Sequence, residues 1–170
     1  NPLGESTGGA VIFGTSGGVL EAALRTAYEW VTKKDLKDVV FSNVRGLEGV
    51  KEATIDLDGT KINVAVTSGL GNARKILEKI QSGEAKYHAI EIMACPGGCI
   101  DGGGQPYIHG DTTIIEKRMK AIYSIDDAKT IRKSHENPYI QKLYREFLGE
   151  PGGKKSHDLL HTHYHSNDID

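Results

Sequence analysis

The sequence predicts an α/β domain in which a mixed sheet is flanked by helices. Short apolar runs alternate with segments of helical spacing, and an Asp-Gly pair separates two runs of alternating polarity. The third observation is that the glycines, 21 of 170 residues, cluster where runs end: Gly14, Gly17 and Gly18, then Gly97, Gly98, Gly102, Gly103 and Gly104. Clustered glycine indicates backbone held in unusual turns or lying close against a bulky group.

The amino-terminal part has the pattern of a strand, a glycine turn and a helix. Val11-Ile12-Phe13 is a short apolar run that ends at Gly14, which predicts a strand. From Val19 onward the apolar residues have helical spacing. Ser16 is the expected N-cap of this helix, and Glu21 in its first turn suits the helix dipole.

The middle of the chain predicts a hairpin, a helix and a third strand. Residues 51–57 and 61–67 alternate in polarity around Asp58-Gly59, a pair that readily adopts the positive φ angles of a type I′ turn. Apolar residues at helical spacing over 73–80 then predict a helix that stops at Ser82-Gly83. Ala89–Met93 is a short apolar run and predicts a strand that leads directly into the cysteines.

The carboxyl-terminal third predicts two further helices. From Thr112 onward, apolar residues recur at helical spacing. Asn137-Pro138 is an N-cap followed by proline at the first helical position. The helix stripe that follows ends at Gly149 and consists of Ile140, Leu143, Tyr144, Phe147 and Leu148. We expect the helix stripes to be core and the last residues of the tail to be frayed.

Composition and charge narrow the functional classes. With 21 Lys and Arg against 23 Asp and Glu, the formal charge is -2, so no basic field suggests nucleic acid or an anionic membrane. No apolar run approaches the roughly 20 residues of a membrane span, and the first residues lack a signal-peptide pattern. We therefore expect a cytoplasmic protein in which Arg132-Lys133 and Lys154-Lys155 are solvated charges.

The two cysteines, Cys95 and Cys99, are separated by Pro-Gly-Gly. Spacing alone leaves three interpretations open: ligands of an iron–sulfur cluster, half of a zinc site, or an inert structural pair. A disulfide would close a very small ring and does not suit a cytoplasmic chain. A zinc site needs a second ligand pair, which the chain offers only far along the sequence, at His157, His161, His163 and His165.

The surroundings of the cysteine pair favour iron–sulfur ligation. The pair follows the carboxyl end of a predicted strand, which is where α/β folds bind their ligands. The glycines have no side chains to block a bulky cluster, and their backbone amides can donate hydrogen bonds to it. A phosphate-binding loop is the competing interpretation of the glycines, but neither of its usual spacings occurs. In the tail, His161, His163 and His165 alternate and give a second metal hypothesis, because alternation places them on one face of an extended segment.

Four segments, in order along the whole chain, resemble the [FeFe] (iron-only) hydrogenase family. They are Phe13–Arg25, Glu91–Cys99 with Gly102–Pro106, Ile131–Pro138 and His157–Tyr164. The resemblance implies the second, carboxyl-terminal lobe of the hydrogenase catalytic domain, with a helical carboxyl-terminal extension. We expect the lobe to cover residues 1–125 and the small-subunit-like helical tail to cover residues 126–170.

The resemblance also implies cofactors, a reaction and residue roles. In the family a [4Fe–4S] cluster is joined through one cysteine sulfur to a di-iron subcluster that carries CO, cyanide and a dithiolate bridge (the H-cluster). The reaction is the reversible oxidation of H2 to protons. Cys95 would be a cubane ligand, and Cys99 would be a cubane ligand and the bridge to the di-iron unit. Met93 would flank that unit, and Phe13 with Gly14 would line its apolar pocket.

The implied partners are H2 and protons, the upstream half of the same catalytic domain, and ferredoxin- or NAD(P)-linked electron-transfer subunits. In the family, the other two cubane cysteines lie in upstream motifs with a Cys-Cys-Pro core and a Pro-Cys start, and this sequence contains neither. We therefore expect the chain alone to be inactive. Two alternatives stay open: a non-enzymatic iron–sulfur assembly or adaptor relative, and a sensory hydrogenase.

Overall fold

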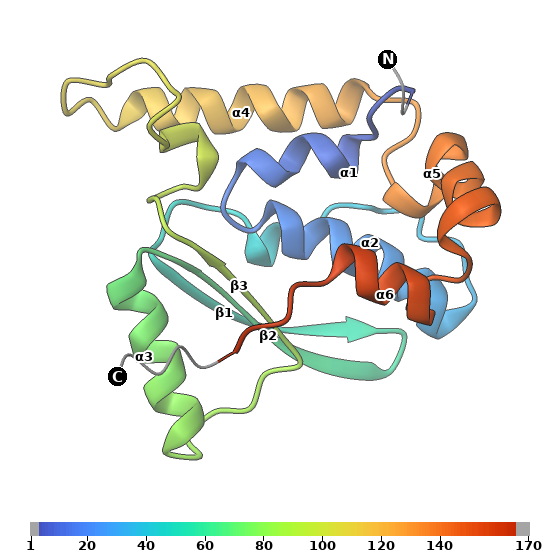
Figure 1. Ribbon diagram of the computed structural model, residues 1–170. Coiled ribbons are helices and arrows are strands. Elements are labelled where there is room, and N and C mark those ends of the chain that lie inside the picture. Colours follow the sequence, from blue (N-terminus) through green and yellow to red (C-terminus); the bar gives the residue numbers. More distant parts are fainter. Residues whose placement is uncertain (1–3, 166–170) are drawn as a thin grey trace. The chain divides into compact units, whose positions relative to one another are not determined.

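The computed structural model describes residues 4–165, which form two compact units. Residues 6–134 make the larger unit, and residues 4–5 with 135–165 make the smaller one. The elements of the larger unit, labelled in Figure 1 where there is room, are α1 (Gly8–Val11), η1 (Ile12–Gly14), α2 (Gly18–Thr32), η2 (Ser42–Val44), β1 (Val50–Leu57), β2 (Thr60–Ser68), α3 (Leu70–Gln81), β3 (Ala89–Met93), η3 (Cys99–Asp101) and α4 (Thr113–Ala128).

The sheet of the larger unit is mixed, with strand order β1-β2-β3. Strands β1 and β2 pair antiparallel, and the hairpin closes at Leu57 opposite Thr60. Asp58 and Gly59 take φ angles of 55° and 94°, so the predicted Asp-Gly turn is confirmed. Strand β3 covers the predicted residues and runs parallel to β2. The mixed sheet with flanking helices confirms the predicted fold class (Figure 1).

Helix α2 packs on one face of this sheet and forms the main core. Leu20 and Leu24 on the helix contact Val64 and Val66, which alternate along β2 and therefore point to the same face. A second cluster joins η1, α2 and α4 through Ile12 and Tyr123. The sheet and the amino-terminal helices are thus held together by α2, which lies in both clusters.

The predicted strand over Val11–Phe13 is wrong, because these residues finish α1 and form the 3-10 turn η1. Thr7 caps the amino end of α1 by accepting a hydrogen bond from the amide of Ala10. Ile12 is fully buried in the second cluster, so its hydrophobicity reflects helix packing. A short apolar run does not by itself distinguish a strand from a buried helical turn.

The smaller unit is helical, with η4 (Ser134–Glu136) at its junction with the larger unit, followed by α5 (Pro138–Leu143), the π-helical turn η5 (Tyr144–Leu148) and α6 (Lys154–Leu160). The Asn137 side chain accepts from the amide of Tyr139, and Pro138 occupies the first turn, as the sequence predicts. Helix α6 lies within the helical carboxyl-terminal extension that the resemblance implies, although no local pattern predicted its bounds. The predicted fraying of the last residues falls partly outside the described part of the chain.

Two expectations about side chains need correction. Lys133 is buried and pairs with Glu29 and Asp35, and Arg132 pairs with two carboxylates on α4, so neither is an ordinary solvated charge. The helix stripes are also only partly core. In α3, Ile76 is buried but Leu77 is 49% exposed, and in the 140–148 stripe only Leu148 is buried among the residues described.

The helix Thr113–Ala128 confirms the element predicted from Thr112 onward. The predicted domain division at residue 125 stays a prediction. Within residues 4–165, none of the helices has the length and apolar character needed to cross a membrane.

Candidate active site

The site begins at the cysteine turn, defined here as Cys95–Cys99, which follows β3 directly. The amide of Gly98 donates to the carbonyl of Cys95 at 3.0 Å and closes the turn. Gly97 and Gly98 have φ angles of 73° and 90°, which side chains rarely adopt, so this turn requires its two glycines. Both thiols are free; Cys95 is partly buried and Cys99 is exposed.

The cysteine turn lies against the glycine turn, defined here as Thr15–Gly18, at the amino end of α2. The amide of Ser16 donates to the carbonyl of Gly97 at 2.9 Å. A Cβ atom at Gly98 would lie 2.8 Å from the Ser16 nitrogen and 2.7 Å from Met93 Sδ. The two glycine clusters of the sequence therefore meet, and Gly98 of the cysteine turn leaves the space that the backbone of the glycine turn occupies.

Glu91 on β3 links the two turns in a way that sequence reasoning missed. Its Oε1 accepts from the amide of Gly17 at 2.5 Å and its Oε2 accepts from the amide of Leu20 at 2.8 Å. A carboxylate from a neighbouring strand thus caps α2, where the helix dipole favours negative charge. Ser16, the predicted N-cap, makes no cap hydrogen bond, and Gly17 holds that position instead.

Replacing Glu91 by Gln should destabilise the larger unit by about 1.5–3 kcal/mol, the usual range for losing hydrogen bonds to a charged group. The glutamine side chain has the same shape as the glutamate side chain, but its NH₂ group would face one of the two backbone N–H donors, that of Gly17 or that of Leu20. Urea unfolding of Glu91→Gln measures the loss, and Glu78→Gln, an exposed change on α3, is the matched control. Equal stability of both variants would show that the Glu91 cap does not hold the two turns together.

The predicted residues Phe13 and Gly14 lie on η1, which contacts η3 at the end of the cysteine turn. A Cβ atom at Gly14 would lie 3.9 Å from Ile100 Cγ2. Phe13 is 46% exposed and Met93 is partly buried. The structure therefore brings the five predicted residues, Phe13, Gly14, Met93, Cys95 and Cys99, to one region at the carboxyl end of β3.

Arg118 on α4 holds the segment that follows the cysteine turn. Its guanidinium donates to the carbonyl of Ile100 at 2.8 Å and to the carbonyl of Pro106 at 2.6 Å. Between these carbonyls, Gly103 and Gly104 have open space around them. This second glycine run is therefore an exposed loop fastened at both ends by one arginine.

A buried charge network lies behind the glycine turn. Arg25 and Glu21 on α2 are fully buried and paired, and Arg45 also pairs with Glu21. The Arg45 guanidinium lies 3.9 Å from the centre of the Tyr123 ring, and the Tyr123 hydroxyl lies 3.3 Å from Thr15 Oγ1. Burial raises the pKa of Tyr123 to about 12, so this phenol stays protonated. The network thus reaches the glycine turn from the protein interior.

The structure also contains a cavity of about 940 Å³ between α4 and the loop that follows η2. Arg45, Glu48, Lys120 and Asp127 give it a mixed charge, and Met119 with Tyr123 adds apolar surface. None of the predicted site residues lines this cavity. The predicted site residues lie elsewhere, on η1, at the end of β3 and in the cysteine turn.

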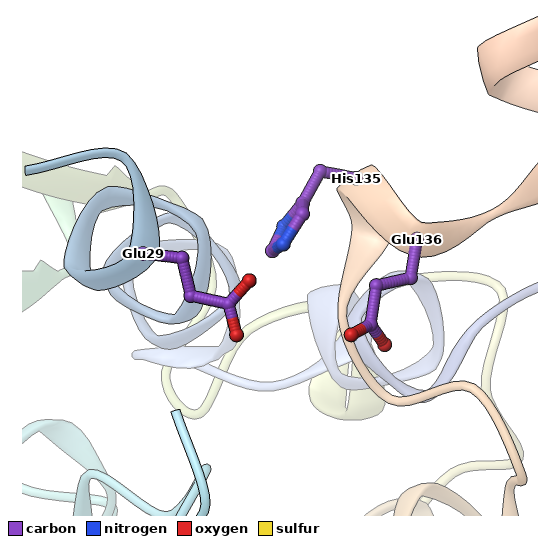
Figure 2. Close-up of side chains that lie close together, drawn as sticks. All are labelled: Glu29, His135 and Glu136. Carbon is purple, nitrogen blue, oxygen red and sulfur yellow. The ribbon is translucent and has the colours of Figure 1, made fainter. Parts of the chain in front are cut away.

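Figure 2 shows Glu29 of α2 together with His135 and Glu136 of η4. Glu29 belongs to the larger unit and the other two residues to the smaller one. Each of the three has interaction partners.

Comparison with known proteins identifies the class to which this fold and site belong. A family model described as "Iron only hydrogenase large subunit, C-terminal domain" matches residues 1–103, and one described as "Iron hydrogenase small subunit" matches residues 112–167. The chain belongs to the iron-only hydrogenase family.

Among particular relatives, the NADP-reducing hydrogenase subunit HndD of Solidesulfovibrio fructosivorans is 57% identical over 163 residues, which cover 96% of this chain and 28% of that protein. The [FeFe]-hydrogenase HydA1 from Chlamydomonas reinhardtii has a solved structure that matches with a TM-score of 0.72 and 47% identity, over 96% of this chain and 48% of the other. This chain thus spans less than half the length of either protein.

A more distant relative comes from a different functional class. The cytosolic iron-sulfur assembly component 3 of Rattus norvegicus is 33% identical over 158 residues, which cover 90% of this chain and 32% of that protein. This chain is therefore similar both to proteins named as hydrogenases and to proteins named as iron–sulfur assembly components.

Proposed function

We propose that this chain is the carboxyl-terminal part of an [FeFe] hydrogenase catalytic subunit and contributes half of a metal centre for the reversible oxidation of H2. The observation that carries this proposal is the cysteine turn. Two free thiols stand at the carboxyl end of β3, on a turn whose glycines keep side chains away. HndD, which is named as a hydrogenase subunit, is 57% identical to this chain, whereas cytosolic iron-sulfur assembly component 3 is 33% identical.

The residues present fit an iron–sulfur cluster. Thiolates are the usual ligands of such clusters, and backbone amides near the sulfurs tune their potential. Ser16 Oγ, buried beside the cysteine turn, has no hydrogen-bond partner within residues 4–165, so it is available as a donor to an acceptor outside the chain. A donor of this kind suits an anionic ligand or a cluster sulfide.

In this proposal the chain's residues have separate tasks. Cys95 and Cys99 would hold a [4Fe–4S] cluster, and Cys99 would also be the bridge to a di-iron subcluster that carries CO, cyanide and a dithiolate. That cofactor, when bound, supplies the chemistry of H2 splitting and electron transfer. Met93, Phe13 and Gly14 provide an apolar wall that excludes water. Glu91 and the Arg25 network keep this wall in place against the cysteine turn.

The chain alone should show no measurable H2 evolution, because two thiolates are half of the four that a [4Fe–4S] cluster needs. The test compares the purified 170-residue chain with the longer polypeptide or complex that contains it, using a reduced dye as the electron source. Activity in the longer form and none in the chain supports the proposal. Hydrogen evolution by the chain alone would contradict it.

The expected partners follow from the same proposal. They are H2 and protons, the upstream half of the catalytic domain, and ferredoxin- or NAD(P)-linked electron-transfer subunits. The name of HndD, an NADP-reducing hydrogenase subunit, supports the NAD(P)-linked choice. A cytoplasmic location and the domain division at residue 125 stay predictions.

The second candidate function is that of a non-enzymatic iron–sulfur assembly factor. The similarity to cytosolic iron-sulfur assembly component 3 favours this candidate, and it extends over 90% of the chain. The identity of 33% is well below the 57% shared with HndD, so we place the hydrogenase first. The two candidates differ in whether a di-iron unit is present.

A further inference from the structure

We propose that His157, His161 and His163 form a binding site for a divalent metal ion of the zinc class, separate from the cysteine turn. The site lies in the smaller unit, on α6 and the residues that follow it. It differs from the alternating trio His161, His163 and His165 expected from the sequence, because the structure pairs His161 with His157. The proposal does not depend on the hydrogenase function.

The geometry of the first two histidines carries the proposal. They are four residues apart, so they lie on one face of the helix, which is the spacing of paired histidine ligands in helical zinc sites. Their Nδ1 atoms are 2.6 Å apart and their ring centres are 4.4 Å apart. Two ring nitrogens of adjacent histidines therefore already converge on the same point.

The third histidine comes from the segment after the helix. The chain leaves α6 at His161, which has extended backbone angles. The ring of His163 then lies 5.3 Å from the ring of His157. The His163 ring is therefore a neighbour of the first pair, although the three rings do not bring one nitrogen each to within 4.8 Å of one another. The His163 side chain has to turn toward the pair to give three imidazole ligands, as in zinc sites that keep their fourth position for solvent.

A metal ion requires a small adjustment of the first two rings and a rotation of the His163 ring toward them. Zinc binds imidazole nitrogen at about 2.0–2.1 Å, so two tetrahedral ligands are separated by roughly 3.3 Å. The Nδ1 atoms of His157 and His161 would move apart by less than about 1 Å, which a change in side-chain torsion can provide. All three histidines are exposed, so the rings have room to move and an ion has access.

The helix that presents the pair is well anchored. Ser156 is buried, and its hydroxyl donates to the carbonyls of Glu150 and Gly153. The two lysines of this helix are also engaged: Lys154 pairs with Asp158 at 2.5 Å, and Lys155 lies 3.7 Å above the Phe147 ring. Their positive charges are thus partly offset by other groups.

The test titrates the 170-residue chain with Zn²⁺ by calorimetry and with Co²⁺ by visible absorption, in a Cys95→Ser/Cys99→Ser background. Removing both thiols ensures that any binding comes from other ligands. We expect one ion per chain, with absorption bands of tetrahedral cobalt and no sulfur charge-transfer band. The substitutions His157→Gln, His161→Gln and His163→Gln should each weaken binding by at least roughly tenfold, since losing even an outer partner of a ligand costs 10–100-fold.

His109→Gln is the matched control, because His109 is also exposed and also lies edge-to-face against another aromatic ring, that of Tyr107. It should bind Zn²⁺ as tightly as the background chain. Far-ultraviolet circular dichroism verifies that each variant is folded. The proposal fails if the background chain binds no stoichiometric ion, or if the three histidine variants bind as tightly as the control.

Discussion

Arg25→Met is expected to lower the free energy of unfolding of the larger unit by about 3–5 kcal/mol, the cost of removing one partner from a buried ion pair. Arg25 is fully buried, and all three of its nitrogens donate. Nε donates to the carbonyl of Val39 at 2.9 Å, while Nη1 and Nη2 donate to the two oxygens of Asp126 at 2.8 Å each. Methionine fills a similar volume but satisfies none of these acceptors.

The loss should be large because the acceptors remain buried. Glu21 and Asp126 are both fully buried and would each lose a cation. Burial acts to raise the pKa of Asp126, but hydrogen bonds from Arg25 and Arg132 outweigh it and hold that pKa below its ordinary value. Asp126 is therefore ionised at neutral pH and would be left with Arg132 alone.

Chemical denaturation at neutral pH measures this loss. The control is Arg74→Met, the same substitution at an exposed position of α3, which should change stability by no more than about 0.5 kcal/mol. If Arg25→Met were as stable as Arg74→Met, the buried network would not be what fastens α2 to α4.

Gly98→Ala should separate the cysteine turn from the glycine turn and reduce iron binding in the longer parent. The φ angle of 90° at Gly98 is strained for alanine by about 1–3 kcal/mol. The added Cβ would also lie 2.8 Å from the Ser16 nitrogen and 3.0 Å from the Thr15 carbonyl carbon. These are backbone atoms, so the clash can be relieved only by moving one turn away from the other.

The measurements for this variant are iron per polypeptide and H2 evolution in the parent, together with urea unfolding of the chain. Gly103→Ala is the matched control in the same loop region, because no atom lies within 4 Å of the place that its Cβ would take. We expect Gly103→Ala to keep its iron and Gly98→Ala to lose most of it. Full iron content in Gly98→Ala would mean that the contact between the turns is not needed to hold the cluster.

Sequence patterns correctly predicted the structural elements that are determined by residues adjacent in the sequence. The Asp58-Gly59 hairpin, the strand Ala89–Met93 and the Asn137 cap all follow from residues adjacent in sequence, and the structure confirms each one. The family resemblance is confirmed by the family matches. The residues Phe13, Gly14, Met93, Cys95 and Cys99 were named from motifs, and their roles stay proposals.

The features that sequence reasoning missed depend on contacts between distant residues. Val11–Phe13 was predicted as a strand because the burial of Ile12 against Tyr123 is not visible in a short apolar run. Lys133 was predicted as solvated because its partners lie about a hundred positions away. Glu91 carried one signal that was available: a carboxylate in the middle of an apolar strand needs a polar partner.

The central claim is that Cys95 and Cys99 provide half of a hydrogenase metal centre. Infrared spectroscopy of the longer parent tests it most directly, since CO and cyanide ligands on iron absorb where protein groups do not. We predict these bands in the native parent and their loss in Cys99→Ser, with Gly103→Ala unchanged. An iron-loaded parent without CO or cyanide bands would contradict the claim and favour the assembly-factor function.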